Sequence, residues 1–345
     1  MKKLKLIRAN RTKFGGAEVY LSRLCEELDN LNISYELVYS NIPKFLPSWL
    51  RVLLFNYQVC KNKTKDDIYL SLERISCPDI YRAGDGVHKV FLQIEKKSKF
   101  NPLHSVYLYL EKRCFTNSKM IIANSNMVKN EIISTYGIDE KKIKVIYNGF
   151  PLEKFDKEKS KENLEKEFSF DLNEKIILYV GSGFKRKGVK EFLEILSKLK
   201  NRNFRAFVIG KEKKTDSYKT LAKNLGLENK VIFTGARSDV KDFYTMSDIF
   251  LFPTRYEPFS NVVLEAMNYE NVVITTKQNG ASEILSNEYT MNSSEDFSIV
   301  EKIDKLLIND LEIEKVKKDN LEIIQNFSIE KNVQQTLKVI NEIIN

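Results

Sequence analysis

A glycine-rich turn with three cations, Gly181 to Gly188, has the composition of a phosphate-binding site. It follows a strand-like run and opens a helical one, so its backbone N–H groups and the helix dipole would face an anion. It is not a Walker A loop, because Val189 stands where that motif needs lysine, and it is not G-x-G-x-x-G. An ordinary strand-to-helix turn with exposed lysines explains the pattern about equally well.

A second chemical segment runs from Glu257 to Met267 and begins just after an apolar run. Glu257 is expected in the loop at the carboxyl end of a strand, and Ser260 or Asn261 could cap the helix that carries Glu265. Carboxylates there would accept hydrogen bonds from sugar or ribose hydroxyls, and backbone N–H groups at 259–261 would suit phosphate. The alternative is that Glu257 is only an N-terminal charge favoured by the helix dipole and Glu265 a solvated helix residue.

The elements that position these groups alternate between strand and helix, which predicts an α/β protein with two doubly wound parallel sheets. We expect strands at 5–9, 35–39, 67–72, 120–124 and 144–147 in the first half. In the second half we expect strands at 175–180, 204–209, 231–234, 249–252 and 272–275, with helices at 189–199, 217–225, 240–246 and 261–269.

The predicted domains are 1–152, of Rossmann-like fold, and 174–330, of the same class, joined by a polar linker at 153–173. A last helix, 331–345, has no strand after it and could pack back on the first domain. Two doubly wound halves predict a ligand in a cleft between the carboxyl ends of the two sheets.

Composition limits the protein class. With 345 residues, 42% hydrophobic and 30% charged, the chain is an ordinary globular protein rather than a disordered or collagen-like one. No apolar run approaches the ~20 residues of a spanning helix, and the amino terminus has no stretch of signal-peptide length, so we expect a cytoplasmic protein. The four widely spaced cysteines and two histidines argue against zinc and favour reduced, buried thiols.

The charge is uneven along the chain. Residues 1–150 hold 25 Lys+Arg against 15 Asp+Glu, a net of +10, while residues 151–345 hold 31 against 32, a net of −1. The first half therefore suits an anionic partner such as a lipid surface, a phosphorylated acceptor or nucleic acid. A lysine-rich solvated surface is the equally good alternative.

Four motifs in order along the chain resemble the retaining glycosyltransferase family 4. They are Gly-Gly-Ala-Glu at 15–18, Asn-Gly at 148–149, the turn at 181–188 and the E-x7-E spacing of Glu257 and Glu265. The stretch Tyr81 to His88 is similar to the lipopolysaccharide core glucosyltransferase I group of that family. The resemblance covers nearly the whole chain.

The resemblance implies a GT-B architecture, with the acceptor on the first domain and a nucleotide sugar on the second. It implies that Lys187 and Arg186 bind the diphosphate, that Glu257 binds hydroxyls of the donor sugar and that Glu265 grips the ribose. The remaining donor-binding residues that it implies are Gly15, Gly16, Gly183, Arg237, Phe259, Ser260 and Asn261. Two departures are Ser182, where arginine is common, and Ser260, where glycine is usual.

The implied reaction is hexosyl transfer from a UDP-sugar, with UDP-glucose as the best choice of donor. The cations of the turn would stabilise the leaving diphosphate without a metal or other cofactor, and the chain has no D-x-D metal motif. No carboxylate stands out as a nucleophile, so same-face attack is favoured, with Lys187 and Glu257 as catalytic groups. Asp85, where many members have a histidine, would orient the donor sugar or the acceptor hydroxyl, while His88 is more often a structural neighbour.

The acceptor is expected to be a lipopolysaccharide or lipooligosaccharide core or a similar phosphorylated glycan at the inner face of the cytoplasmic membrane. Basic residues beside aromatic ones at 48–65 and 96–115 would suit reversible, peripheral binding to an anionic membrane. Two ordinary core helices explain these segments about as well.

Three alternatives remain open from the residues. UDP-galactose or UDP-N-acetylglucosamine could be the donor for another polysaccharide or lipid-linked glycan, because sugars differ by one or two contacts. A GT-B sugar-nucleotide epimerase is a less favoured enzyme class. A nucleic-acid binder would explain the basic half but not Glu257 and Glu265.

Overall fold

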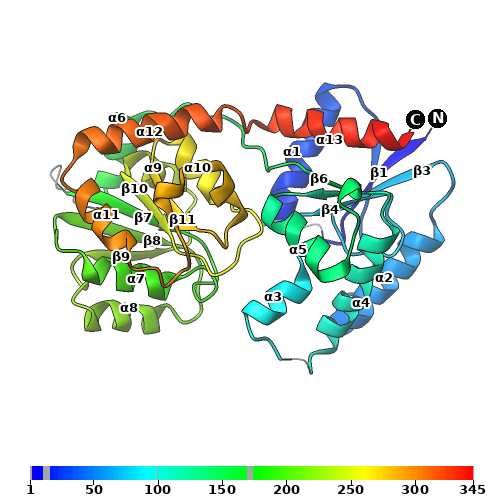
Figure 1. The fold of residues 1–345 in the computed structure, drawn as a ribbon, viewed down its shortest axis with the longest axis horizontal. Helices are drawn as coiled ribbons and strands as arrows, with labels where there is room; N and C mark the ends of the chain where they lie inside the picture. The colour runs from blue at the N-terminus through cyan, green and yellow to red at the C-terminus, as the bar shows by residue number, and fades with distance from the viewer. Residues whose placement is uncertain (1, 11–15, 99, 169–173, 345) are drawn as a thin grey trace. The chain divides into compact units, whose positions relative to one another are not determined.

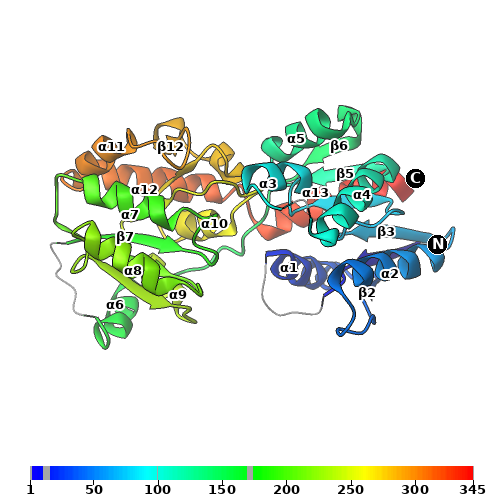
Figure 2. The same ribbon diagram turned by 90° about the horizontal axis from the view of Figure 1, so that it is seen from below.

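The computed structural model describes residues 2–10, 16–98, 100–168 and 174–344. They form two compact units, one of residues 1–149 with 329–345 and one of residues 150–328. Each unit is an α/β layer structure with a parallel sheet flanked by helices (Figures 1 and 2). The expected α/β class with two doubly wound parallel sheets is confirmed.

The first unit is built on a six-stranded parallel sheet in the order β2-β1-β3-β4-β5-β6. Its strands are β1 (Lys3–Ile7), β2 (Tyr35–Val38), β3 (Asp67–Ser71), β4 (Ile80–Ala83), β5 (Met120–Ala123) and β6 (Ile143–Val145). Its helices are α1 (Gly16–Asn30), α2 (Ser48–Lys61), α3 (His88–Ile94), α4 (Pro102–Asn117), α5 (Asn126–Tyr136) and α13 (Ile329–Ile344).

Alternation along β1 sends side chains to both faces of this sheet. Leu4 and Leu6 pack in a core with the apolar stripe of α1 and with α13. Ile7 packs instead with Phe55 and Val59 of α2. Two helical layers therefore cover the sheet, as a doubly wound fold requires.

One strand of the first unit, β4, was missing from the sequence interpretation, which read this stretch only as a motif. Its four residues include Arg82, which spoils the apolar pattern of a central strand. In the fold Arg82 is buried, its guanidinium lies 3.5 Å from the ring centre of Tyr20, and it donates to Asn148 Oδ1 at 2.6 Å. These partners make a charged residue tolerable inside the sheet.

The second unit has its own six-stranded parallel sheet, in the order β12-β11-β10-β7-β8-β9. Its strands are β7 (Lys175–Val180), β8 (Phe204–Ile209), β9 (Val231–Gly235), β10 (Ile249–Phe252), β11 (Val272–Thr276) and β12 (Thr290–Met291). Its α-helices are α6 (Lys157–Glu165), α7 (Val189–Lys198), α8 (Thr215–Asn224), α9 (Val240–Met246), α10 (Asn261–Asn268), α11 (Ile299–Leu306) and α12 (Asp310–Ile324).

The segment expected to be a linker, 153–173, is instead partly folded into the second unit. It holds α6, whose Ser160 hydroxyl and Asn163 amide both donate to the Asp242 carboxylate, at 2.9 and 3.1 Å. The boundary between the units falls between Gly149 and Phe150. The pattern hid this helix because polar bonds hold it and only Ser160 and Leu164 are buried, so it shows no apolar stripe.

The carboxyl-terminal helix α13 belongs to the first unit, where the sequence suggested it could pack. Val333, Val339 and Ile340 are buried in the core that α1 shares with the sheet. The Asn332 side-chain amide also donates to the Tyr147 carbonyl at 2.5 Å. The chain thus returns to its first unit after completing the second.

The expectation of reduced thiols is wrong for two of the four cysteines. Cys60, in the last turn of α2, and Cys77, after β3, form a disulfide. Cys25 and Cys114 are free, and Cys114 is fully buried. Seventeen positions separate the paired cysteines, and only the packing of α2 on β3 brings them together.

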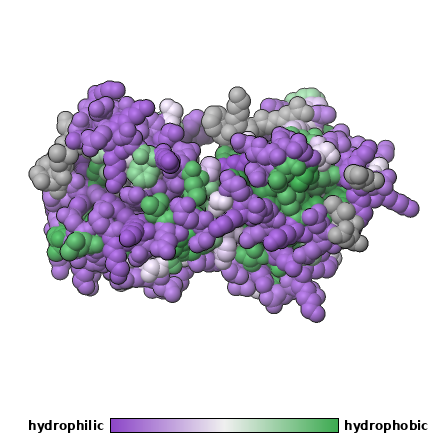
Figure 3. Space-filling model, turned by 90° about the horizontal axis from the view of Figure 1, so that it is seen from above, coloured by the Kyte–Doolittle hydropathy of each residue, from purple (hydrophilic) through white to green (hydrophobic). Residues whose placement is uncertain are grey.

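Among the described residues, no helix is long and apolar enough to cross a membrane. Most of the surface seen from above is hydrophilic, and hydrophobic side chains gather there in separate patches (Figure 3). In the first unit, Phe45 and Phe100 are the most exposed of the large apolar side chains, at 85% and 97%.

Candidate functional site

The chemistry-bearing residues of the second unit gather at one edge of its sheet. Strands β7, β10 and β11 are neighbours and parallel, so the loops that follow them share that edge. The glycine-rich turn follows β7, the loop with Glu257 follows β10, and the loop with Asn279 follows β11. Ligands of open α/β sheets bind at this carboxyl edge.

The turn after β7 depends on two glycines in the left-handed region, Gly183 at φ 78° and Gly188 at φ 79°. Gly188 is also the residue before α7, and a Cβ there would overlap the Pro253 carbonyl. From Val189 onward, α7 buries an apolar stripe that includes Phe192 and Leu196. The helix is thereby fixed with its amino end at the turn, where its dipole favours an anion.

Arg186, Lys187 and Glu257 form one charged cluster at this edge. Arg186 Nη1 lies 2.7 Å from Glu257 Oε2, and Lys187 Nζ lies 3.7 Å from the same oxygen. The side chains of Lys187 and Glu257 are each 17% exposed, and that of Arg186 is 29% exposed. Two cations on one partly desolvated carboxylate leave positive charge that an added anion would neutralise.

The loop with Glu257 is held by the neighbouring loop after β11. Glu257 N–H donates to the Gln278 carbonyl at 2.9 Å, and Gly280 N–H donates to the Glu257 carbonyl at 3.0 Å. Asn279 is fully buried, and its Oδ1 accepts from Ser260 N–H at 3.2 Å. The sequence interpretation missed Asn279, although an Asn-Gly pair shortly after a strand could have marked it.

Two details of this loop differ from the hydrogen bonds expected for Ser260. Ser260 N–H is occupied by Asn279, so it is not a free donor for phosphate. Ser260 is the residue before α10, but its side chain makes no capping hydrogen bond. Phe259 is buried and Asn261 is the first residue of the helix. Glu265 lies further along α10 and accepts from the Tyr244 hydroxyl at 3.1 Å.

Arg237 lies apart from this cluster, after β9, two strands beyond β7 in the sheet order. Its guanidinium donates to Asp239 at 2.7 and 2.8 Å and to Glu167 at 2.8 Å. The hydrogen bonds from Arg237 lower the pKa of Asp239. Its charge is therefore already balanced within the second unit.

A buried tyrosine below the turn is a residue that pattern reading did not single out. Tyr179, in β7, is fully buried, and within the described part of the chain its hydroxyl has no hydrogen-bond partner. The hydroxyl is close to Gly181, at 3.4 Å from where a Cβ there would be. Burial raises the pKa of Tyr179 well above 10, so it stays a neutral donor.

The first unit holds Asp85, just after β4, and Gly16 at the start of α1; Gly15 lies outside the described residues. The Asp85 side chain is 53% exposed and its carboxylate is 3.8 Å from Arg74 Nη1. Arg74 Nε is also 3.6 Å from the buried Glu111 carboxylate, which accepts from His88 N–H at 2.6 Å. This chain of contacts fixes the loop that carries Asp85.

His88 does not have the environment of a general base. Its ring packs between those of His104 and Tyr107, with His104 Nδ1 3.2 Å from His88 Nε2. Burial, aided by the Arg74 charge, lowers the pKa of His88 to about 4. The ring is therefore neutral near pH 7 and acts as a structural neighbour of Asp85.

Two family models match the chain. The model for glycosyl transferases group 1 matches residues 160–326, and the model for glycosyltransferase family 4 matches residues 84–154. The matched ranges contain Asp85 and the whole charged cluster of the second unit. The chain therefore carries glycosyltransferase domains of both kinds.

Several curated relatives of the chain are named as glycosyltransferases. The capsular polysaccharide biosynthesis glycosyltransferase CapM of Staphylococcus aureus is 35% identical over 59% of this chain and 56% of CapM. A diphospho-undecaprenol N-acetylgalactosaminyltransferase of Campylobacter jejuni is 25% identical over 77% of this chain and 63% of that protein. The lipopolysaccharide glucosyltransferase WaaG of Escherichia coli is 36% identical over 29% of this chain and 28% of WaaG. The chain spans about half the length of the curated relatives it matches.

Solved structures resemble the glycosyltransferase over nearly its full length. A WaaG crystal structure has a TM-score of 0.80 at 18% identity and covers 98% of this chain and 99% of that one. HepE of Anabaena, in complex with UDP and glucose, has a TM-score of 0.76 at 18% identity. The match covers 99% of this chain and 100% of the HepE chain. These likenesses establish the fold, which is the GT-B fold expected from the sequence.

Proposed function

We propose that this glycosyltransferase moves a hexose, with retention, from a UDP-sugar to a glycan acceptor. The observation that carries the proposal is the cluster of Arg186, Lys187 and Glu257 at the amino end of α7. It combines cations for a diphosphate with a carboxylate for sugar hydroxyls. The HepE complex with UDP and glucose supports a UDP-sugar as donor, and UDP-glucose is our first choice.

In the proposed reaction, the charge that develops on UDP is met by Lys187, Arg186 and the amino end of α7. Glu257 holds donor hydroxyls, and Glu265 binds the ribose. Gly183 and the backbone at Phe259 and Asn261 line the donor. These further donor contacts rest on the family resemblance, as does the base contact of Arg237.

We propose a metal-independent, same-face attack, in which Arg186 and Lys187 stabilise the leaving diphosphate. Among the described residues, no group of three or more His, Cys, Asp or Glu is placed to hold a metal ion. Asp85 of the first unit would orient the donor sugar or the acceptor hydroxyl rather than act as a nucleophile. Its side chain is 53% exposed and lies 3.8 Å from Arg74 Nη1, so the carboxylate oxygens are accessible to accept a hydrogen bond.

For the acceptor, we propose a lipopolysaccharide core or similar glycan on an anionic membrane surface. The exposed rings of Phe45 and Phe100 precede α2 and α4, whose first turns line a common cavity. Lysines 44, 96 and 97 are close to them in sequence. Exposed apolar rings that are close in sequence to basic residues fit reversible, peripheral binding. Within the segment 96–115, Leu110 and Phe115 are fully buried and serve the core instead.

The closest alternative is a transferase that uses UDP-galactose or UDP-N-acetylglucosamine for another polysaccharide or lipid-linked glycan. The names of CapM and of the Campylobacter jejuni transferase favour this reading. Incubation with donor alone, followed by product analysis, separates either transferase from an epimerase.

The deciding experiment is calorimetry of the full chain with UDP, UDP-glucose, UDP-galactose and UDP-N-acetylglucosamine. We expect binding of UDP, a preference among the sugars, and no loss of binding with a chelator present. Absence of heat with UDP would overturn the proposal. Co-sedimentation with phosphatidylglycerol vesicles at low and high salt tests the membrane part separately.

A further inference from the structure

A cavity of about 420 Å³ lies within the first unit at the carboxyl edge of its sheet. Its lining comes from the segments just after β1, β2 and β3, which are adjacent parallel strands, and from the first turns of α2 and α4. Among the lining residues, Ala9 follows β1, Ser40 follows β2 and Arg74 follows β3. This is the position at which open α/β sheets bind ligands, and the volume suits one or two sugar rings.

The cavity carries more positive than negative charge. Of the residues that the structure describes, Lys44, Arg51 and Arg74 line it, against the single carboxylate of Glu73. That carboxylate is already paired, since Arg8 Nη1 lies 2.9 Å from it. Among the described residues, Lys44 and Arg51 have no carboxylate partner, and Arg51 reaches only the Ser48 hydroxyl of its own helix, at 3.4 Å.

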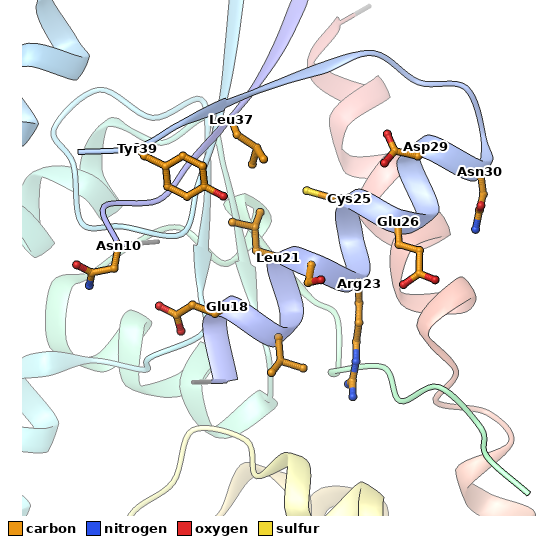
Figure 4. Close-up of a pocket in the computed structure, with 12 residues that line it drawn as sticks. Asn10, Glu18, Leu21, Arg23, Cys25, Glu26, Asp29, Asn30, Leu37 and Tyr39 are labelled. Carbon is orange, nitrogen blue, oxygen red and sulfur yellow. The ribbon is translucent and has the colours of Figure 1, made fainter. Parts of the chain in front are cut away.

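A second hollow of the first unit shows that this charge is local. It has a volume of about 1010 Å³ and lies along α1 and the edge strand β2 (Figure 4). Glu18, Glu26 and Asp29 line it, and Arg23 is the one cation among its described lining residues. Although the first half is basic overall, its two hollows therefore differ in charge, and the smaller cavity is the more cationic of the two.

The smaller cavity is also connected to the residue proposed to orient the reaction. Arg74 is 90% buried as a side chain, and its guanidinium faces both the Tyr107 ring, 5.7 Å away, and the Asp85 carboxylate, 3.8 Å away. Ile42, Phe55 and Leu103 supply apolar walls. An occupant would thus meet cations, an aromatic ring and apolar surface within reach of Asp85.

We propose that this cavity binds the anionic group, a phosphate or a carboxylate, of the saccharide acceptor, with Lys44 and Arg51 as its recognition residues. The inference rests on the proposed function, because it assigns the cavity to the acceptor of that reaction. Lys44 is exposed and Arg51 is half-buried, and two such cations without carboxylate partners among the described residues can bind this group by charge-assisted hydrogen bonds. A neutral saccharide lacks this contribution.

Calorimetry with glucose 6-phosphate tests the proposal on the full chain saturated with UDP, so that the second unit's cations are occupied. We expect binding of glucose 6-phosphate and none of glucose. Arg51→Gln and Lys44→Gln should each weaken binding by about tenfold or more, as expected for loss of one charged hydrogen bond. Lys141→Gln, which removes an exposed lysine near the opposite edge of the sheet, is the charge-matched control.

Equal binding by the wild type, R51Q and K44Q would overturn the proposal, as would absence of binding by the wild type. Phosphatidylglycerol vesicles test whether the cations bind a lipid headgroup instead of the saccharide. R51Q should bind glucose 6-phosphate more weakly than the wild type but should still bind the vesicles. Loss of vesicle binding alone would assign the cations to lipid and overturn the acceptor assignment. Should UDP not bind, the proposed function fails, whereas Arg51-dependent binding of glucose 6-phosphate without UDP would still support an anion site here.

Discussion

Arg186 Nη1 donates to two oxygens at 2.7 Å, the Glu257 carboxylate and the Tyr256 carbonyl. The bond to the backbone holds the guanidinium in place independently of the carboxylate. The positive group of the turn and the acidic group of the next loop therefore form a preorganised pair rather than a chance surface contact.

Glu257→Gln should separate sugar recognition from diphosphate binding. Arg186 keeps its backbone partner and the two cations lose a competing carboxylate, so UDP should bind at least as tightly as before. Turnover of UDP-glucose should fall about 100-fold, because a charged acceptor of donor hydroxyls is lost. Calorimetry and initial rates measure the two effects, with Glu162→Gln on α6 as an exposed control. Parallel loss of UDP binding would contradict this division of roles.

Lys187→Ala should lower kcat about 100-fold or more, since removal of one group that stabilises a leaving-group charge has effects of this size. Lys185→Ala is a matched control, because Lys185 is an exposed lysine of the same turn. Steady-state kinetics with UDP-glucose compare the two. Near-normal turnover of K187A, or an equal loss in K185A, would remove the basis of the proposed mechanism.

The two left-handed glycines of the turn offer a test of local packing. Gly183→Ala should cost about 1–2 kcal/mol of unfolding free energy, because only the backbone conformation is strained. Gly188→Ala meets the same strain and also the Pro253 carbonyl, so it should cost about 1–3 kcal/mol more. Urea unfolding measures both. Equal losses of unfolding free energy in the two variants would show that the close approach of Gly188 to Pro253 adds no further strain.

His88 should give the protein a pH dependence in the mildly acidic range. Its folded-state pKa of about 4 lies below the ordinary histidine value of 6.5, so the unfolded chain binds more protons between these values. The free energy of unfolding should therefore decline as the pH falls from about 6.5 toward 4. His88→Gln should flatten that decline. A wild-type His88 resonance that titrates near pH 6.5 by NMR would contradict the burial argument.

Loss of the disulfide should destabilise the first unit. Its cysteines are 17 positions apart, and closing a loop of this size contributes about 3 kcal/mol. The double variant Cys60→Ser with Cys77→Ser should thus melt at a lower temperature than the oxidised wild type. Added reductant should lower the melting temperature of the wild type and leave the double variant unchanged. Insensitivity of the wild type to reductant would show that the bond does not stabilise it.

The sequence alone determined many elements of the second unit and the positions of its glycine turn and Glu257 along the chain. The helix at Val240–Met246 and the strands at Phe204–Ile209 and Ile249–Phe252 have the bounds that their apolar patterns predict. The glycine turn and Glu257 could both be placed at strand ends, because turn glycines and strand ends are local features of a chain.

Only the tertiary structure decided which groups meet. Several contacts join segments that are distant in sequence. Arg186 and Lys187 share Glu257, Asn279 supports the loop with Glu257, and Cys60 is bonded to Cys77. Strand β4 and helix α6 escaped prediction because buried polar partners, rather than an apolar pattern, hold Arg82 and Ser160. The apolar periodicity of a segment indicates which of its residues are buried. Pairing between polar groups depends instead on the three-dimensional path of the chain.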